Sequence, residues 1–199
     1  MMQKELKEIY AEILRLQEQA EGYWSQLREE FDYSIKNGKV RFDKTIKKLH
    51  RSYRVSSIRY LANANFFHLI TAPVIYGMIF PIVFFDLTLT IYQHICFRAY
   101  KIPRVARAEY FKLDRHLLSY LNTIEKVNCL YCSYGNGVVA YSREILARTE
   151  QFWCPIKHAV KLKGHHDRYQ NFSEYGDAEN YRDKLIALRG DLSQEGEKK

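Results

Sequence analysis

The stretch FFHLITAPVIYGMIFPIVFFDLTLTIYQHICF, residues 66–97, decides how this 199-residue chain folds. Asp86 is its one Asp, Glu, Lys or Arg side chain. A helix needs about 20 apolar residues to cross a hydrocarbon core of about 30 Å, and residues 66–85 meet that requirement. The whole run is too long for one span and too short for two. The sequence therefore predicts a membrane segment, which we place at residues 64–97.

Two membrane arrangements fit this segment. In the first, one helix crosses at residues 66–85 and residues 86–97 lie at the surface. In the second, the chain enters, bends near Gly77–Pro81, where proline removes a backbone donor, and leaves on the same side as a re-entrant hairpin. Lys/Arg-rich flanks prefer the cytoplasmic side, and the flanks here contain Arg51, Arg54 and Arg59 before the segment and Arg98, Lys101, Arg104 and Arg107 after it. We favour the hairpin; a buried helical hairpin in a soluble protein is the alternative without a membrane.

The charge of the chain, formally +8, is concentrated beside the apolar run. Residues 36–63 contain nine basic and one acidic side chain, and residues 98–107 contain four basic and no acidic ones. An apolar segment between two basic patches favours anionic membrane lipids as partners and argues against nucleic acid. The charged, periodic N-terminus leads us to expect no cleavable secretory signal.

The first 35 residues predict a coiled-coil helix. Apolar side chains recur every three or four positions, with charged and amide side chains between them. Through residues 1–31 this seam could bind a second copy or another membrane protein, or it could fold back onto its own chain; the pattern does not separate these. A turn signal at Asn37-Gly38 closes the helix, and residues 36–63 predict a basic amphipathic helix at the membrane surface.

Residues 98–190 predict a compact helical domain on the cytoplasmic side, and residues 191–199 a disordered tail. Within the domain, one helix ends near SYGNG, residues 133–137, because glycines interrupt it. A second helix follows, and a short amphipathic helix ends at Gly190 as its C-cap.

Four residues in this domain have the spacing of a metal site: Cys129, Cys132, Cys154 and His158. A Cys-x2-Cys pair grips an ion from a turn, and Cys-x3-His places two ligands on one helix face, as in many structural Zn²⁺ sites. Pro155 suits a first helical position, which would make Cys154 an N-cap with a lowered thiol pKa. We expect Zn²⁺.

Other interpretations of these residues remain open. Iron or a [2Fe–2S] cluster could occupy the same ligands, the Cys-x2-Cys pair could be a redox dithiol, or the thiols could simply be buried. His165 or His166 could replace His158. A separate possibility is a site formed by Asp86, His94 and His68 at membrane depth; the alternative places Asp86 at the interface beside Arg98 or Arg104.

Two segments, FFDLTLTIYQHICFRAYKIPR (84–104) and YLNTIEKVNCLYCSYGNGVVAYSREILARTEQFWCPIKHA (120–159), resemble a family of uncharacterised proteobacterial membrane proteins. The resemblance covers about residues 80–185, including all four predicted ligands. It implies a bacterial origin and a membrane setting, and together with the basic flanks it places the main domain on the cytoplasmic side of the inner membrane.

The sequence thus predicts an all-α membrane protein. The first functional hypothesis is a non-enzymatic structural or assembly factor whose metal holds the cytosolic domain together. The second is a membrane-anchored redox protein with iron at the same ligands, which would be coloured. The third is a membrane-bound enzyme, which would require Asp86, His94 and His68 to converge.

Overall fold

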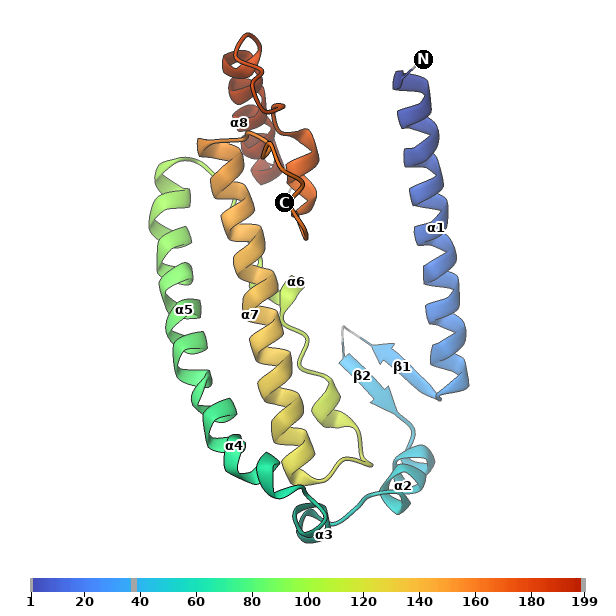
Figure 1. Cartoon of the computed structure of the whole chain (residues 1–199). Coiled ribbons are helices and arrows are strands. Elements are labelled where there is room, and N and C mark those ends of the chain that lie inside the picture. The colour runs from blue at the N-terminus through green and yellow to red at the C-terminus, as the bar shows by residue number, and fades with distance from the viewer. Residues whose placement is uncertain (1, 37–38, 198–199) are drawn as a thin grey trace. The chain divides into compact units, whose positions relative to one another are not determined.

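The computed structural model describes residues 2–36 and 39–197. The chain forms two compact units: Met1–Ala62 with Asp114–Lys126, and Asn63–Leu113 with Val127–Lys199. Helices make up most of both units (Figure 1), which confirms the predominantly helical prediction. Among these described residues, one short β-hairpin is the exception.

The first unit begins with helix α1 (Met2–Glu30), which ends where Asp32 adopts a left-handed φ of 51°. Strands β1 (Tyr33–Lys36) and β2 (Lys39–Phe42) then pair antiparallel, with Tyr33 opposite Phe42. The prediction of one helix over residues 36–63 is therefore wrong. Apolar residues alternate along both strands, and this period of two is typical of a hairpin. The predicted turn at Asn37-Gly38 lies outside the described residues.

Two short helices complete this part of the first unit: α2 (Lys44–Ser52) and α3 (Ser57–Ala62). Asp43 caps α2, because its Oδ1 accepts a hydrogen bond from the Thr45 N–H at 2.9 Å. A 3₁₀ turn at Arg115–Leu117 belongs to the same unit.

The apolar run forms one bent helical rod in the second unit. Helix α4 (Phe66–Gly77) leads through Met78 into α5 (Ile79–Tyr92), which ends in the π-helical turn Gln93–Phe97. The predicted hairpin at Gly77–Pro81 is therefore wrong. Pro81 is the third residue of α5, where a backbone N–H has no partner within the helix, so the missing donor costs little.

After the rod, the chain returns along it before α7 (Thr123–Trp153) begins. Residues 98–113, which we call the return segment, contain the single-turn helix α6 (Arg107–Tyr110). Contacts of α7 with the rod progress in the same order along both, from Asn128 with Tyr76 to Tyr141 with Gln93. The two therefore run parallel, side by side (Figure 1).

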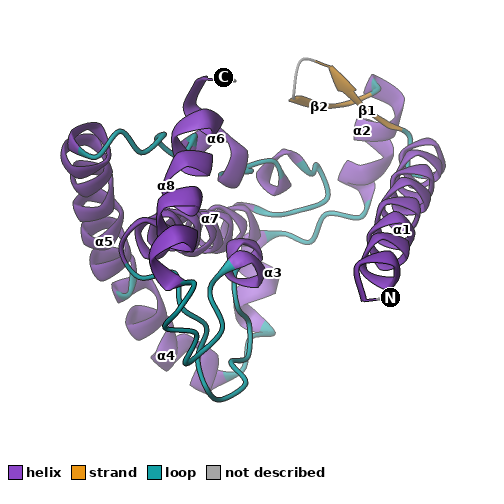
Figure 2. Ribbon diagram, turned by 90° about the horizontal axis from the view of Figure 1, so that it is seen from above, coloured by secondary structure: helices purple, strands orange, loops and turns teal. Residues whose placement is uncertain are grey.

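The core of the second unit lies where α5, the return segment and α7 meet. Its buried side chains are Leu89, Phe97, Ile102, Val105, Tyr141 and Ile145. In Figure 2 the outer side of α5 faces away from α7 and stays uncovered. Within the part of the chain that the structure describes, one helix, Phe66–Phe97, is long and apolar enough to cross a membrane, and only 11% of an 18-residue apolar stretch of it is buried inside the protein.

Helix α7 is not broken at SYGNG, so the prediction of two helices there is wrong. A glycine inside a helix costs only about 1 kcal/mol relative to alanine, and these glycines face neighbouring side chains. A Cβ on Gly137 would lie 2.9 Å from Phe111 Cδ1. The close approach of the return segment to α7 therefore requires glycine at this position.

The C-terminal part packs against the end of α7. It contains the 3₁₀ turn Asp167–Asn171 and helix α8 (Tyr181–Glu197). The predicted C-cap at Gly190 and the predicted disorder of residues 191–197 are wrong; residues 198–199 lie outside the described residues. Leu192 is 1% exposed and shares a buried stripe with Leu185 and Leu188, so packing carries α8 past Gly190.

Candidate functional site

Asp86 on α5 is one of two charged residues that are buried among the described residues of the second unit, the other being Arg148. The guanidinium of Arg107 donates to both carboxylate oxygens of Asp86, with Nη1–Oδ1 at 2.5 Å and Nη2–Oδ2 at 2.6 Å. The hydroxyl of Tyr134 on α7 donates to Oδ2 at 2.7 Å. This cluster, Asp86, Arg107 and Tyr134, joins α5, α6 and α7. The predicted partners Arg98 and Arg104 were wrong: the partner is Arg107.

Aromatic rings hold the guanidinium of Arg107 in place. Its Cζ lies 3.9 Å above the ring centroid of Phe111 and 5.7 Å from that of Tyr141. The side chain of Asp86 is 7% exposed, whereas that of Arg107 is 44% exposed. The hydrogen bonds from Arg107 to Asp86 raise the pKa of the guanidinium above its ordinary value. The pair is therefore a bidentate, charge-assisted connection.

A second polar connection lies two turns further along the rod. Gln93 donates to the hydroxyl of Tyr141, and its Oε1 accepts from the Val105 N–H at 3.1 Å. Gln93 is buried away from water. Its amide nitrogen and its amide oxygen each form a hydrogen bond inside the protein, as buried polar groups usually do. These contacts fix the return segment between α5 and α7. Asp86 itself is surrounded by three donors, two from Arg107 and one from Tyr134, rather than by an open ligand position.

The four predicted metal ligands are not brought together in this chain. Cys129 and Cys132 lie on α7, and Cys154 follows the end of the same helix. Cys132 and Cys154 are 22 positions apart, which corresponds to roughly 33 Å of helix, whereas Zn²⁺–thiolate bonds are about 2.3 Å long. Because of the same separation, the four residues of one chain do not surround a common position for an iron ion or a [2Fe–2S] cluster in this fold. Among residues 2–36 and 39–197, no group of three or more His, Cys, Asp or Glu side chains is placed to hold a metal ion.

Cys154 ends a helix instead of beginning one. Its N–H donates to the Glu150 carbonyl at 2.9 Å, in continuation of α7, and Pro155 then stops the helix. The prediction that Cys154 is an N-cap is therefore wrong. His158 stacks on the Tyr169 ring at a centroid distance of 6.1 Å, as does His165 at 5.4 Å. Nε2 of His166 lies 2.8 Å from Glu150 Oε2.

The structure also separates the residues of the predicted membrane-depth site. His68, Asp86 and His94 lie on one helical rod, where the 18 positions between the first two correspond to about 27 Å. His94 is exposed, and its Nδ1 lies 2.7 Å from the Thr90 carbonyl. The three side chains do not converge.

A second ionic cluster, which the sequence did not reveal, fastens α8 to α7. Arg168 binds Glu144 of α7, Glu195 of α8 and the amide oxygen of Gln151, all at 2.8–3.0 Å. Burial alone would lower the pKa of Arg168, but the hydrogen bonds to Glu195 and Glu144 outweigh it and raise the pKa. The three partners are 24, 27 and 17 positions away along the chain, so no local pattern signals them.

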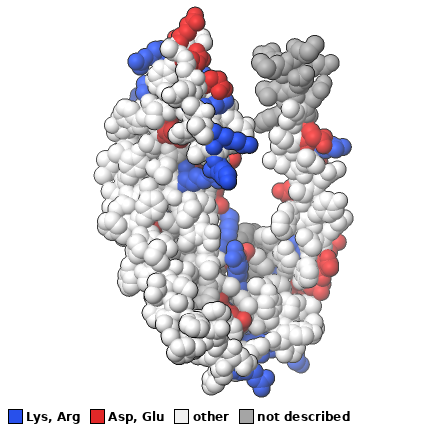
Figure 3. All heavy atoms as spheres, viewed as in Figure 1, with Lys and Arg blue, Asp and Glu red and all other residues white. Residues whose placement is uncertain are grey.

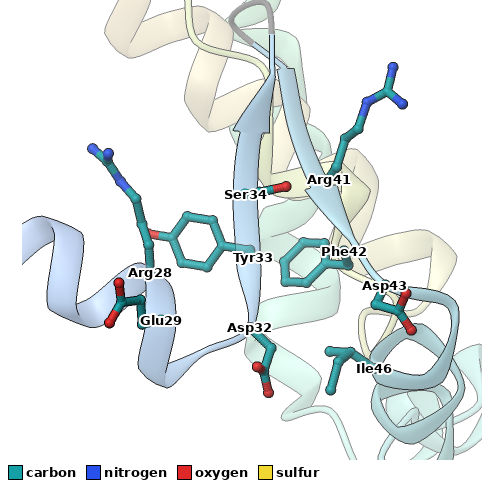
Figure 4. Close-up of a pocket in the computed structure, with 9 residues that line it drawn as sticks. All are labelled: Arg28, Glu29, Asp32, Tyr33, Ser34, Arg41, Phe42, Asp43 and Ile46. Atoms are coloured by element: carbon teal, nitrogen blue, oxygen red, sulfur yellow. The ribbon is translucent and has the colours of Figure 1, made fainter.

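The first unit has an open recess of about 610 Å³ between the end of α1, the hairpin and α2. Figure 4 shows the rings of Tyr33 and Phe42 side by side at its centre, with Arg28 and Arg41 reaching outward. Acidic side chains, Glu29, Asp32 and Asp43, share the rim. With cations and carboxylates mixed, the recess does not select a ligand of one charge.

No protein-family model, no curated protein and no solved structure matches this chain.

Proposed function

We propose that this protein is a membrane-bound structural or assembly factor, anchored by α4 and α5, that recruits a partner through α1. The observation that carries the proposal is the exposed apolar surface of residues 66–97, where only 11% of an 18-residue apolar stretch is buried inside the protein. The core helix of a soluble protein would bury most of that surface. Exposed side chains on the rod include Phe66, Val74, Phe80, Phe84, Leu87, Ile91 and Ile95.

The parallel course of the rod and α7 supports an anchor that lies in the membrane surface. If the rod crossed the bilayer, the chain would have to recross it between Phe97 and α7. The return segment contains Arg98, Lys101, Arg104, Arg107, Glu109 and Lys112, and each charge near the bilayer centre costs about 3 kcal/mol. A rod with its outer face in the lipid and the return segment toward water avoids this cost.

The distribution of charge fits this arrangement. Figure 3 shows an uncharged surface over α4 and α5. The basic residues that precede and follow the rod then lie on one side of the membrane without a hairpin, as the positive-inside rule favours. We place that side in the cytoplasm.

Helix α1 supports the recruiting role. Its seam residues Ile9, Ile13, Leu16, Tyr23 and Leu27 are exposed, and the rest of the first unit leaves them uncovered. An apolar stripe at heptad spacing, left open on a 29-residue helix, is suited to a parallel or antiparallel coiled coil. A second copy of α1 is the simplest partner that offers the same stripe.

The anchor is tested by flotation of the full chain with neutral phosphatidylcholine vesicles. We expect the wild type to float, and Phe80→Glu with Phe84→Glu to reduce flotation strongly. Lys112→Glu, which also adds negative charge but lies on the return segment, should float like the wild type. Equal flotation of all three proteins would contradict the anchor.

The in-plane arrangement is tested by labelling single cysteines in a variant whose four native cysteines are replaced by serine. Ser52→Cys and Ala99→Cys, both at exposed positions, flank the rod. We expect a membrane-impermeant maleimide to label both positions only after cells are opened. Labelling of one position in intact cells would show that the rod crosses the membrane.

A further inference from the structure

A basic pocket lies where the rod ends. Its volume is about 400 Å³, and its polar lining consists of His94, Arg98, Lys101 and Arg104. The remaining lining residues are Phe97, Ile102 and Pro103. Three permanent cations therefore converge on a partly apolar pocket that has no acidic side chain in its lining.

The backbone at this pocket holds Lys101 in a conformation that glycine normally adopts. Lys101 has a φ of 57°, and the hydrogen bonds Ile102 N–H to Phe97 carbonyl (2.8 Å) and Lys101 N–H to Arg98 carbonyl (3.4 Å) form a Schellman cap. A side chain in this left-handed region costs about 1 kcal/mol. The cap alone would favour glycine, so the lysine needs another reason for its position.

The dipole of the preceding helix does not explain why three cationic side chains line this pocket. The C-terminus of a helix is equivalent to about half a negative charge, and the cap already satisfies two of its carbonyls. Within the described residues, Arg98, Lys101 and Arg104 form no ion pair with an acidic side chain. The pocket therefore keeps more than two unbalanced positive charges at the edge of the apolar surface.

We propose that this pocket binds the phosphate group of an anionic membrane phospholipid. The inference rests on the proposed anchor, because the pocket opens at the end of the lipid-facing rod, where headgroups meet hydrocarbon. Two arginine forks and one ammonium supply charge-assisted donors to phosphate oxygens. The apolar wall of Phe97, Ile102 and Pro103 suits the glycerol part of the same lipid.

The test is a binding titration of the full chain in neutral detergent micelles with dioctanoyl phosphatidylglycerol, dioctanoyl phosphatidylcholine and inorganic phosphate as probes. The pocket variant is Arg98→Gln with Arg104→Gln. The matched control is Arg51→Gln with Arg54→Gln, which removes the same charge from the other basic flank. Lys101→Gly is a third variant. It removes the positive charge and also the strain of a side chain at a φ of 57°.

We expect the pocket variant to bind phosphatidylglycerol at least about tenfold more weakly than the wild type, as expected when charge-assisted hydrogen bonds are lost. The control should change by less than about twofold, as screened surface charges do. Lys101→Gly should weaken binding while raising the melting temperature, which separates lost binding from unfolding.

Equal weakening in the pocket variant and the control would overturn the site in favour of diffuse attraction. Displacement of the lipid by submillimolar inorganic phosphate would assign the pocket to a soluble phosphate and overturn the lipid. Neither result depends on flotation with neutral phosphatidylcholine vesicles, so the anchor and the pocket can fail separately.

Discussion

Arg107 on the return segment grips both carboxylate oxygens of Asp86 on α5, at 2.5 and 2.6 Å. The carboxylate is almost fully buried and the guanidinium is half exposed. This pair, with Tyr134, fixes the return segment beside an otherwise apolar rod. Since a lone buried charge is costly while a lone exposed one is not, the two partners should respond unequally to mutation.

The first prediction concerns this asymmetry. Arg107→Gln leaves the Asp86 carboxylate buried with Tyr134 as its one side-chain donor, and should lower the free energy of unfolding by about 3 kcal/mol. Asp86→Asn leaves Arg107 with access to water and should cost only about 1–2 kcal/mol. Chemical denaturation in detergent micelles measures both, and the double variant should cost less than the sum of the two. A larger loss for Asp86→Asn would contradict the pairing.

The second prediction compares two neighbouring glycines of α7. A Cβ on Gly135 would lie 3.7 Å from Ile82 Cδ1, an ordinary contact, whereas one on Gly137 would press on the Phe111 ring. That ring cannot easily move, because Arg107, Tyr134 and Tyr141 all pack on it. Gly135→Ala should stabilise by up to about 1 kcal/mol, and Gly137→Ala should be about 1–3 kcal/mol less stable than Gly135→Ala. The melting temperatures of the two variants, measured by thermal unfolding, test this prediction. Equal melting temperatures would contradict the close approach of Phe111 to Gly137.

The third prediction concerns the seam of α1. Leu16→Glu places a charge on the exposed apolar stripe and should dissociate the proposed coiled coil, since a charge at a core position is not tolerated. Light scattering on the detergent-solubilised protein should then show half the protein mass of the wild type. Gln19→Glu, which adds the same charge off the stripe, is the control and should leave the mass unchanged. If the wild type itself is a monomer, the partner of α1 is not a second copy of this chain.

Composition predicted the long apolar helix of residues 66–97, but proline and glycine residues led to wrong predictions of where helices bend or end. Pro81 suggested a bend back, yet a proline in the first turn of a helix removes no hydrogen bond. The glycines of SYGNG suggested an end to the helix, yet Gly137 is required by Phe111, which is 26 positions away. The residue at which α5 begins decides the first case, and the contact between Gly137 and Phe111 decides the second. Neither can be read from the residues next to the proline or the glycines.

The four predicted ligands lie apart in this chain for a related reason. If a helix ended at the glycines, the residues between Cys132 and Cys154 could form a second helix that folds back and brings the two cysteines together. Because the glycines are part of the continuous helix α7, the same residues instead hold the cysteines far apart. The clusters that hold the second unit together, around Asp86 and Arg168, join residues up to 48 positions apart. Single-sequence patterns do not register such pairs.

The fourth prediction is a pH dependence at the start of α2. The Thr45 N–H donates to Asp43, and this hydrogen bond lowers the pKa of the carboxyl below its ordinary value of 3.8. A carboxylate whose pKa is lowered in the folded state stabilises it above the ordinary pKa, and the contribution disappears as the pH falls through the lowered pKa. The amide proton shift of Thr45, followed by NMR from pH 6 to about pH 2, should therefore titrate with a midpoint below 3.8. Asp43→Asn keeps the cap but has no proton to gain, so its Thr45 shift should stay constant. A midpoint at or above 3.8 in the wild type would mean that the hydrogen bond does not form.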